Sequence, residues 1–142
     1  MTFNFILRLS ALCLASLWMA SAAGASKSAT DAEVFFANLQ DEQTVTSPFT
    51  VEFGIKNMAV IPAGVEHTNS GHHHLLINVD DIDLSAPIPS DDHHRHFGKG
   101  QTETTLELEP GTYELQLLLG DYLHRPHGTP VMSEKITLVV SE

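Results

Sequence analysis

Short runs of alternating apolar and polar residues constrain the fold of this chain more than any other feature. The clearest run is FTVEFGI (49–55), in which every second residue is apolar and would lie on one face of an extended strand. Similar runs, separated by Gly, Pro, Asn and Asp, predict further strands at 33–39, before Pro48, and at 72–79, 102–109, 112–119 and 134–140. Helical periodicity is absent from these runs. The pattern predicts an all-β fold, a single immunoglobulin-like antiparallel β-sandwich.

Two features of the chain indicate how these strands connect. Pro110-Gly111 separates two alternating runs and predicts a hairpin that pairs 102–109 with 112–119. The acidic, proline-bearing segment 80–101 and the segment 120–133 are predicted to be loops.

The beginning of the chain resembles a secretory leader. Arg8 is the only charged residue among the first 26, and an apolar run follows it. Both Ala20-Ser21-Ala22 and Ala23-Gly24-Ala25 fit the small-x-small rule for cleavage, and we expect cleavage after Ala25. The predicted organisation is a signal peptide at 1–25 and a β-sandwich domain with histidine-rich loops at 26–142. A retained membrane anchor is the alternative, but the apolar run is too short to span a bilayer.

Composition restricts what the processed chain can bind. The only cysteine, Cys13, lies in the leader, so disulfides and thiolate metal sites are not expected. Loss of Arg8 leaves 18 acidic and six basic residues, a net charge of −12 with neutral histidines. Such a surface repels nucleic acid and anionic membranes and attracts cations. The alternative is that the acidity only keeps an exported protein soluble.

Histidine is the residue that points to chemistry. All nine histidines lie between His67 and His127. Apart from His67, they form clusters at 72–74, 93–96 and 124–127. The predicted hairpin places the second and third clusters at one end of a sheet. The first cluster joins them if strand 72–79 runs antiparallel to 112–119.

Alternation indicates which imidazoles can converge. In GHHHLLINVD (71–80), His72 and His74 share one face, whereas His73 points toward the core and is expected to be hydrogen-bonded there. Asp121 and Glu103 are candidates to supply a carboxylate or to orient a ring. The predicted metal ligands are His72, His74, His94, His96, His124 and His127.

The residue types of this set favour particular metals. Neutral imidazole suits copper(II), zinc, nickel or iron(II) better than calcium or magnesium. Met58 and Met132 are the only methionines after the leader, too few for a sulfur-rich copper(I) site. We therefore expect copper(II) or zinc. The FGKGQT segment lacks the spacing of a phosphate loop, and neither G-x-S-x-G nor H-E-x-x-H occurs.

Four stretches resemble one protein family. They are PFTVEFGIKNMAVIPAG (48–64), GHHHLLI (71–77), HFGKGQTETTLELEPGTYELQLLLGD (96–121) and HRPHGTPVMSEKI (124–136). Together they are similar to a family of bacterial exported domains known as domain of unknown function 4399. The resemblance implies a small β-rich periplasmic domain with no settled activity. It also implies that His67 and His93 lie outside the family's histidine pattern, in agreement with solvated side chains.

The sequence thus predicts a periplasmic or secreted protein that binds copper(II) or zinc, for buffering, delivery or sensing. The expected partner is the metal ion, and another periplasmic protein is a further candidate. Nucleic acid is not an expected partner, and no membrane anchor is expected after processing. Two alternatives stay open. The same histidines could hold a catalytic metal with an open position for water or oxygen, or they could form a metal-free hydrogen-bonding network in an interaction module.

Overall fold

A computed structural model describes residues 24–142 of the chain. The predicted leader lies outside the described residues except for Gly24 and Ala25. The strands are β1 (Glu33–Phe36), β2 (Gln43–Thr46), β3 (Phe49–Lys56), β4 (Ala59–Val60), β5 (Ser70–Ile77), β6 (His94–His96), β7 (Glu103–Leu106), β8 (Gly111–Gly120) and β9 (Ile136–Ser141). Residues 24–142 contain no helix, and therefore none long and apolar enough to cross a membrane.

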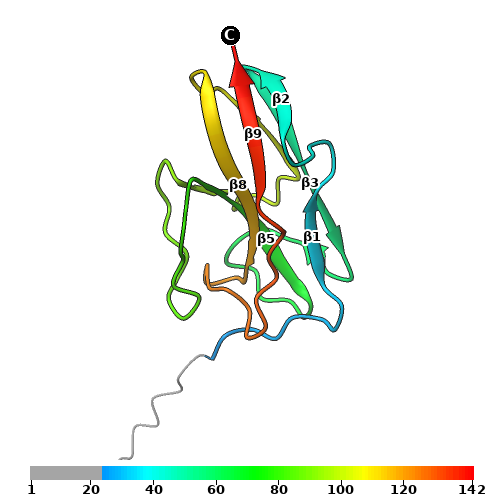
Figure 1. The fold of residues 1–142 in the computed structure, drawn as a ribbon. Coiled ribbons are helices and arrows are strands. Elements are labelled where there is room, and N and C mark those ends of the chain that lie inside the picture. The colour runs from blue at the N-terminus through cyan, green and yellow to red at the C-terminus, as the bar shows by residue number, and fades with distance from the viewer. Residues whose placement is uncertain (1–23) are drawn as a thin grey trace, which may run out of the picture.

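The strands form two packed sheets (Figure 1). The smaller sheet has the order β1-β3-β7, and the larger has the order β2-β9-β8-β5-β4, with β6 also paired to β5. The predicted all-β sandwich is confirmed, while its immunoglobulin-like character stays a prediction.

The sequence suggested that every strand pair is antiparallel, but two pairs are parallel. β2 runs parallel to β9, and β4 runs parallel to β5. Parallel neighbours need a connection that returns the chain to the end where it started. The loop 61–69 provides this return between β4 and β5, and β2 and β9 lie far apart in the sequence. No tight turn links either pair, so local turn residues do not set their direction.

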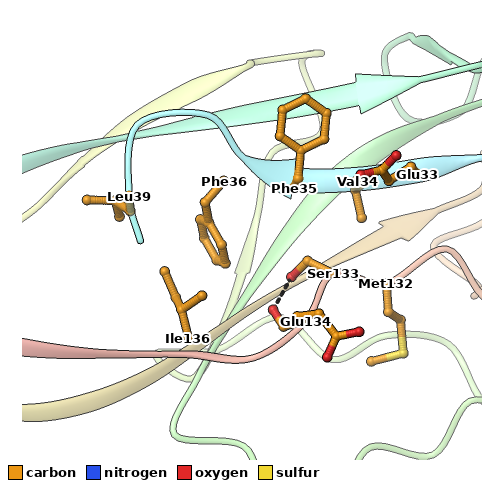
Figure 2. A pocket seen from close by; sticks show the side chains of 9 residues that line it. All are labelled: Glu33, Val34, Phe35, Phe36, Leu39, Met132, Ser133, Glu134 and Ile136. Carbon is orange, nitrogen blue, oxygen red and sulfur yellow. Dashed lines mark hydrogen bonds between the residues drawn. The ribbon is translucent and has the colours of Figure 1, made fainter. Parts of the chain in front are cut away.

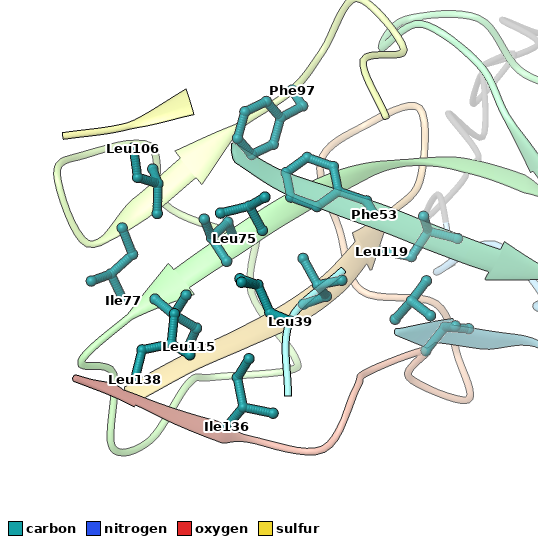
Figure 3. Close-up of a cluster of buried hydrophobic side chains, with 14 residues drawn as sticks. Leu39, Phe53, Leu75, Ile77, Phe97, Leu106, Leu115, Leu119, Ile136 and Leu138 are labelled. Carbon is teal, nitrogen blue, oxygen red and sulfur yellow. The ribbon is translucent and has the colours of Figure 1, made fainter. Parts of the chain in front are cut away.

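The main core lies between the two sheets (Figure 3). The smaller sheet contributes Val51, Phe53 and Leu106, and β5, β8 and β9 of the larger sheet contribute alternate leucines and isoleucines. Leu75 and Leu117, opposite each other on β5 and β8, are fully buried. The alternation in the sequence therefore identifies the core-facing side of these strands.

The predicted hairpin at Pro110-Gly111 is wrong. β7 pairs with β3 in the smaller sheet, whereas β8 pairs with β5 and β9 in the larger one. Residues 107–110 therefore cross between the sheets, and Leu106 remains buried in the core on one side of this crossing. Alternation specifies which face of a strand is buried, but it does not specify the neighbouring strand.

The outer face of the larger sheet is also covered. Leu76 and Leu118 project there from β5 and β8 and pack against Ile88, which belongs to the loop between β5 and β6. Part of the segment predicted as a loop is the short strand β6, which pairs antiparallel with β5. Its sequence, His-Arg-His, has no apolar residue that would have predicted a strand. The strand forms through backbone pairing with β5, and none of its side chains faces the core.

Candidate metal centre

Strand β5 presents its three histidines to two different sides. His73 points into the core, where its ring lies 5.1 Å from that of Phe53. His72 and His74 lie on the outer face of the larger sheet, which confirms the predicted alternation. All three side chains are at most 1% exposed, so β5 buries imidazole on both faces of the sheet.

Two strand pairings bring distant histidines to the same place. The antiparallel pairing of β5 with β8 sets His72 opposite Gly120, and the turn that follows Gly120 carries His124. The pairing of β5 with β6 sets His96 opposite His74. The predicted antiparallel relation of strands 72–79 and 112–119 is thus confirmed, although the hairpin invoked alongside it does not exist.

Four imidazole rings form a compact group, which we call the histidine cluster: His72, His74, His96 and His124. The ring centroids of His72 and His74 are 4.8 Å apart, and that of His96 is 5.0 Å from the first and 5.1 Å from the second. His124 lies 4.6 Å from His96, 5.0 Å from His72 and 6.3 Å from His74. His72 and His74 form a buried floor, and the half-buried His96 and His124 form its rim.

Three histidines of this cluster, His72, His74 and His96, have ring nitrogens that are close together and without hydrogen-bond partners among the described residues. One nitrogen each of His72, His74 and His96 can be chosen so that all lie within 4.8 Å of one another. Nitrogens in a tetrahedral zinc–imidazole site are about 3.3 Å apart, given bonds of about 2.0 Å. Both nitrogens of His72 and His74, and Nε2 of His96, are buried and lack a hydrogen-bond partner among the described residues.

The cluster favours neutral imidazole. Burial, followed by positive charge on His96 and His124, lowers the pKa of His72 from 6.5 to about 4, against the opposing effect of Asp121. Burial, together with the neighbouring His72, His96 and His124, lowers the pKa of His74 to about 2. The pKa of His96 is lowered by burial and then by His124. At neutral pH these rings therefore keep lone pairs that can coordinate a cation.

Two glycines make room for the rings, and sequence reasoning missed both roles. A Cβ on Gly120 would lie 2.5 Å from Cε1 of His74, and a Cβ on Gly98 would lie 2.5 Å from Nε2 of His96. Neither glycine needs a left-handed backbone. The sequence suggested a bulge or tight bend for Gly98, whereas the structure indicates space for an imidazole. The only signal is the proximity of each glycine to a histidine segment.

Asp121 organises the turn that carries His124. Its Oδ1 accepts hydrogen bonds from the backbone N–H groups of Leu123 (2.8 Å) and Arg125 (3.0 Å). The N–H of His124 donates to the carbonyl of Asp121 at 2.9 Å, and His124 has a φ of 62°. Asp121 thus supports a rim histidine through the backbone. Glu103, the other predicted carboxylate, lies on β7 in the smaller sheet, opposite Glu52.

His94 and His127 do not join the rings of the cluster. His94 shares the face of His96 but lies two pairs further along, opposite Leu76, and its Nδ1–H donates to Asp91 at 2.8 Å. Nε2 of the buried His127 donates to the carbonyl of Ser70 at 3.0 Å, so this ring ties its loop to the start of β5.

The remaining histidines lie where a binding role was not expected. His67 and His93 are exposed. His73 is buried in the core as predicted, but its expected hydrogen bond is not found among the described residues.

One groove lies away from the histidine cluster (Figure 2). It has a volume of about 320 Å³ and lies between β1 and the segment that leads into β9. Phe36, Leu39 and Ile136 point toward one another in it, and Ser133 and Glu134 line another part. No histidine lines this groove.

Comparison with known proteins supports the family resemblance. Neither the curated proteins nor the solved structures give a significant match to this chain. The family described as Domain of unknown function (DUF4399) matches residues 51–141, a range that includes every histidine of the cluster. Because this match covers more than half of the chain, the protein belongs to the DUF4399 family.

Proposed function

We propose that this chain is an exported protein, periplasmic or secreted, that binds copper(II) or zinc through His72, His74, His96 and His124. The observation that carries the proposal is the set of buried ring nitrogens without hydrogen-bond partners. Each such group costs about 1–3 kcal/mol when left unsatisfied, and native proteins contain few of them. Coordination of one cation would satisfy several of them together.

The chemistry of the ligands supports a divalent transition metal. The cluster offers imidazole nitrogen without thiolate, and this donor set suits copper(II) and zinc. The low pKa values of His72 and His74 leave each ring neutral at pH 7, with one nitrogen that carries a free lone pair. Of the six histidines expected as ligands, we retain four, because His94 and His127 are directed at Asp91 and Ser70.

The arrangement of floor and rim supports reversible binding, as buffering, delivery or sensing requires. Two ligands are rigidly placed on β5, while His96 and His124 are half-buried and come from a short strand and a turn. An ion could enter and leave on the rim side without opening the core. The acidic composition of the chain would attract cations to this surface.

Direct metal titration tests the proposal. The processed protein is purified without an affinity tag, stripped with a chelator, and titrated with copper(II) and with zinc by calorimetry. We expect binding of one ion per chain and a higher melting temperature with the metal, because ligands that bind only the native state stabilise it. Absence of binding by both metals, with unchanged melting temperature, would contradict the proposal and favour a metal-free interaction module.

A further inference from the structure

Among residues 24–142, the packed part begins at Ser26. Gly24 and Ala25 are exposed, and a Cβ on Gly24 would meet no atom within 4 Å. From Ser26 onward the chain is held, since the carbonyl of Ser26 accepts a hydrogen bond from Gly128 at 2.9 Å. Ser28 is buried, and its hydroxyl donates to the carbonyl of Thr129 at 3.0 Å. In Figure 1 this first segment (blue) runs beside the loop that precedes β9 (orange).

The backbone nitrogen of Ser26 lies beside a buried carboxylate. Asp121 is 1% exposed, and its Oδ2 accepts a hydrogen bond from Ser26 N at 3.3 Å. Burial raises the pKa of Asp121, but hydrogen bonds from Arg125, Leu123 and Ser26 outweigh it and lower the pKa below its ordinary value. The carboxylate is therefore charged at neutral pH, and the bond from Ser26 is a long one to a neutral donor. A cation at the position of Ser26 N would bind this carboxylate more strongly.

We propose that export processing cuts the Ala25–Ser26 bond and that the released α-ammonium group of Ser26 forms an ion pair with Asp121. This inference rests on the export that is part of the proposed function. A signal peptidase adds one water across the peptide bond, which leaves a carboxylate on Ala25 and an amino group on Ser26. The amino group takes up a proton, since an α-amine has a pKa of about 7.7–8.0 before any carboxylate raises it.

The position of the cut decides whether this ion pair forms. Cleavage after Ala22, the other small-x-small site in the sequence, would leave Ala23-Gly24-Ala25 attached. The charged amino group would then be on Ala23, three residues before the Ser26 nitrogen that contacts Asp121. The N–H of Ser26 would then remain a neutral peptide donor. Only cleavage after Ala25 converts it into a charged one. Asp121 also fixes the turn that carries His124, so processing would strengthen one support of the histidine cluster.

Two versions of the full chain test the inference. The native chain and an Ala25→Gln variant are exported from a bacterium, and intact mass and amino-terminal sequencing define each product. We expect the native product to begin at Ser26 and the variant to be cut after Ala22. The native product should melt roughly 3–6 °C higher at pH 7, because it gains a charge-assisted hydrogen bond. A native product that begins elsewhere, or equal melting temperatures for the two products, would overturn the inference.

Two further measurements separate this inference from the metal site. The difference in melting temperature should disappear when both chains also carry Asp121→Asn. If that change prevents folding, the pKa of the Ser26 amino group is measured by NMR and should exceed the usual α-amine range, and a value within that range contradicts the ion pair. Zinc titration of the native product tests the histidine cluster, so absent metal binding with normal processing and a raised Ser26 pKa would refute only the metal proposal.

Discussion

The imidazole rings of His74 and His96 lie 5.1 Å apart because the register of β5 and β6 pairs these two residues directly. His74 belongs to a long central strand, whereas His96 ends a strand of only three residues. The ring of His74 is therefore fixed by a central strand, whereas that of His96 depends on a short pairing at the surface. This difference makes the rim histidines the better targets for mutation, since their replacement should leave the sandwich intact.

Replacement of His96 or His124 by alanine should weaken copper(II) or zinc binding by at least about 100-fold, since each change removes a direct ligand. Both side chains are half-buried, so the free energy of unfolding of the metal-free protein should change by less than about 1 kcal/mol. Calorimetric titration measures the first effect, and urea unfolding in the presence of chelator measures the second.

His93→Ala provides the matched control for these rim variants. His93 immediately precedes β6, but its side chain is exposed and its Nδ1 lies 2.9 Å from the carbonyl of Ile77. Metal affinity should therefore remain at the wild-type value. An equal loss from His93→Ala and His96→Ala would show that the assignment of ligands is wrong.

The metal-free protein should lose stability as the pH falls below 6.5. Burial, with added repulsion between the clustered rings at His72 and His74, holds the pKa of His72 and His73 at about 4 and that of His74 at about 2, whereas the unfolded chain titrates near 6.5. Between these values the unfolded state binds more protons than the native state, so protonation favours unfolding. From pH 6.5 to 5.5 the free energy of unfolding should fall by on the order of 2–4 kcal/mol.

Urea denaturation at pH 7.5, 6.5 and 5.5 in the presence of chelator measures this trend. Between pH 7.5 and 6.5 the unfolded chain is only partly protonated at these three histidines, so the fall in the free energy of unfolding there should be smaller, about 1 kcal/mol. Stability that stays constant or rises between pH 6.5 and 5.5 would contradict the assignment of neutral buried rings. Added zinc should raise stability most at pH 7.5, because protons compete with the metal for the same nitrogens at lower pH.

Sequence patterns predicted the faces of β5 well. Alternation sent His73 toward the core with Leu75 and Ile77, and it placed His72 and His74 together on the opposite face. This inference is reliable because adjacent side chains of any extended strand point to opposite sides of the sheet. The convergence of the three histidine segments was also predicted, although it arises from the pairing of β5 with β8 and β6 rather than from a hairpin.

Other parts of the site could not be read from the sequence. The two parallel strand pairs and the crossing from β7 to β8 depend on which edges meet in three dimensions, and local turn residues carry no information about that. His127 follows Pro126 in the same turn-rich loop as His124. The ring of His127 donates a hydrogen bond to a backbone carbonyl, whereas the ring of His124 joins the cluster. Backbone acceptors are invisible in a sequence, so the two roles could not be separated.

His73 should be replaceable without loss of metal binding. Its ring is fully buried against Phe53, and neither nitrogen has a hydrogen-bond partner among residues 24–142. His73→Leu removes the unsatisfied polar atoms and keeps a similar volume, so it should stabilise the protein by about 1–2 kcal/mol. It should also reduce the loss of stability below pH 6.5. A large fall in zinc affinity in this variant would instead indicate that the core-facing ring takes part in the site.

The space at Gly98 should be necessary for metal binding. A Cβ there would overlap the ring of His96 and also lie 3.3 Å from Ala63, so Gly98→Ala must displace that ring or its backbone. We expect a loss of zinc affinity of about 10–100-fold, similar to that from other changes that misplace a ligand. Gly128→Ala is the matched control, because its new Cβ would have only the carbonyl oxygen of Ser26, at 3.9 Å, as a neighbour within 4 Å. Zinc titration should distinguish the two variants, and equal affinities would show that His96 does not need this position to bind the ion.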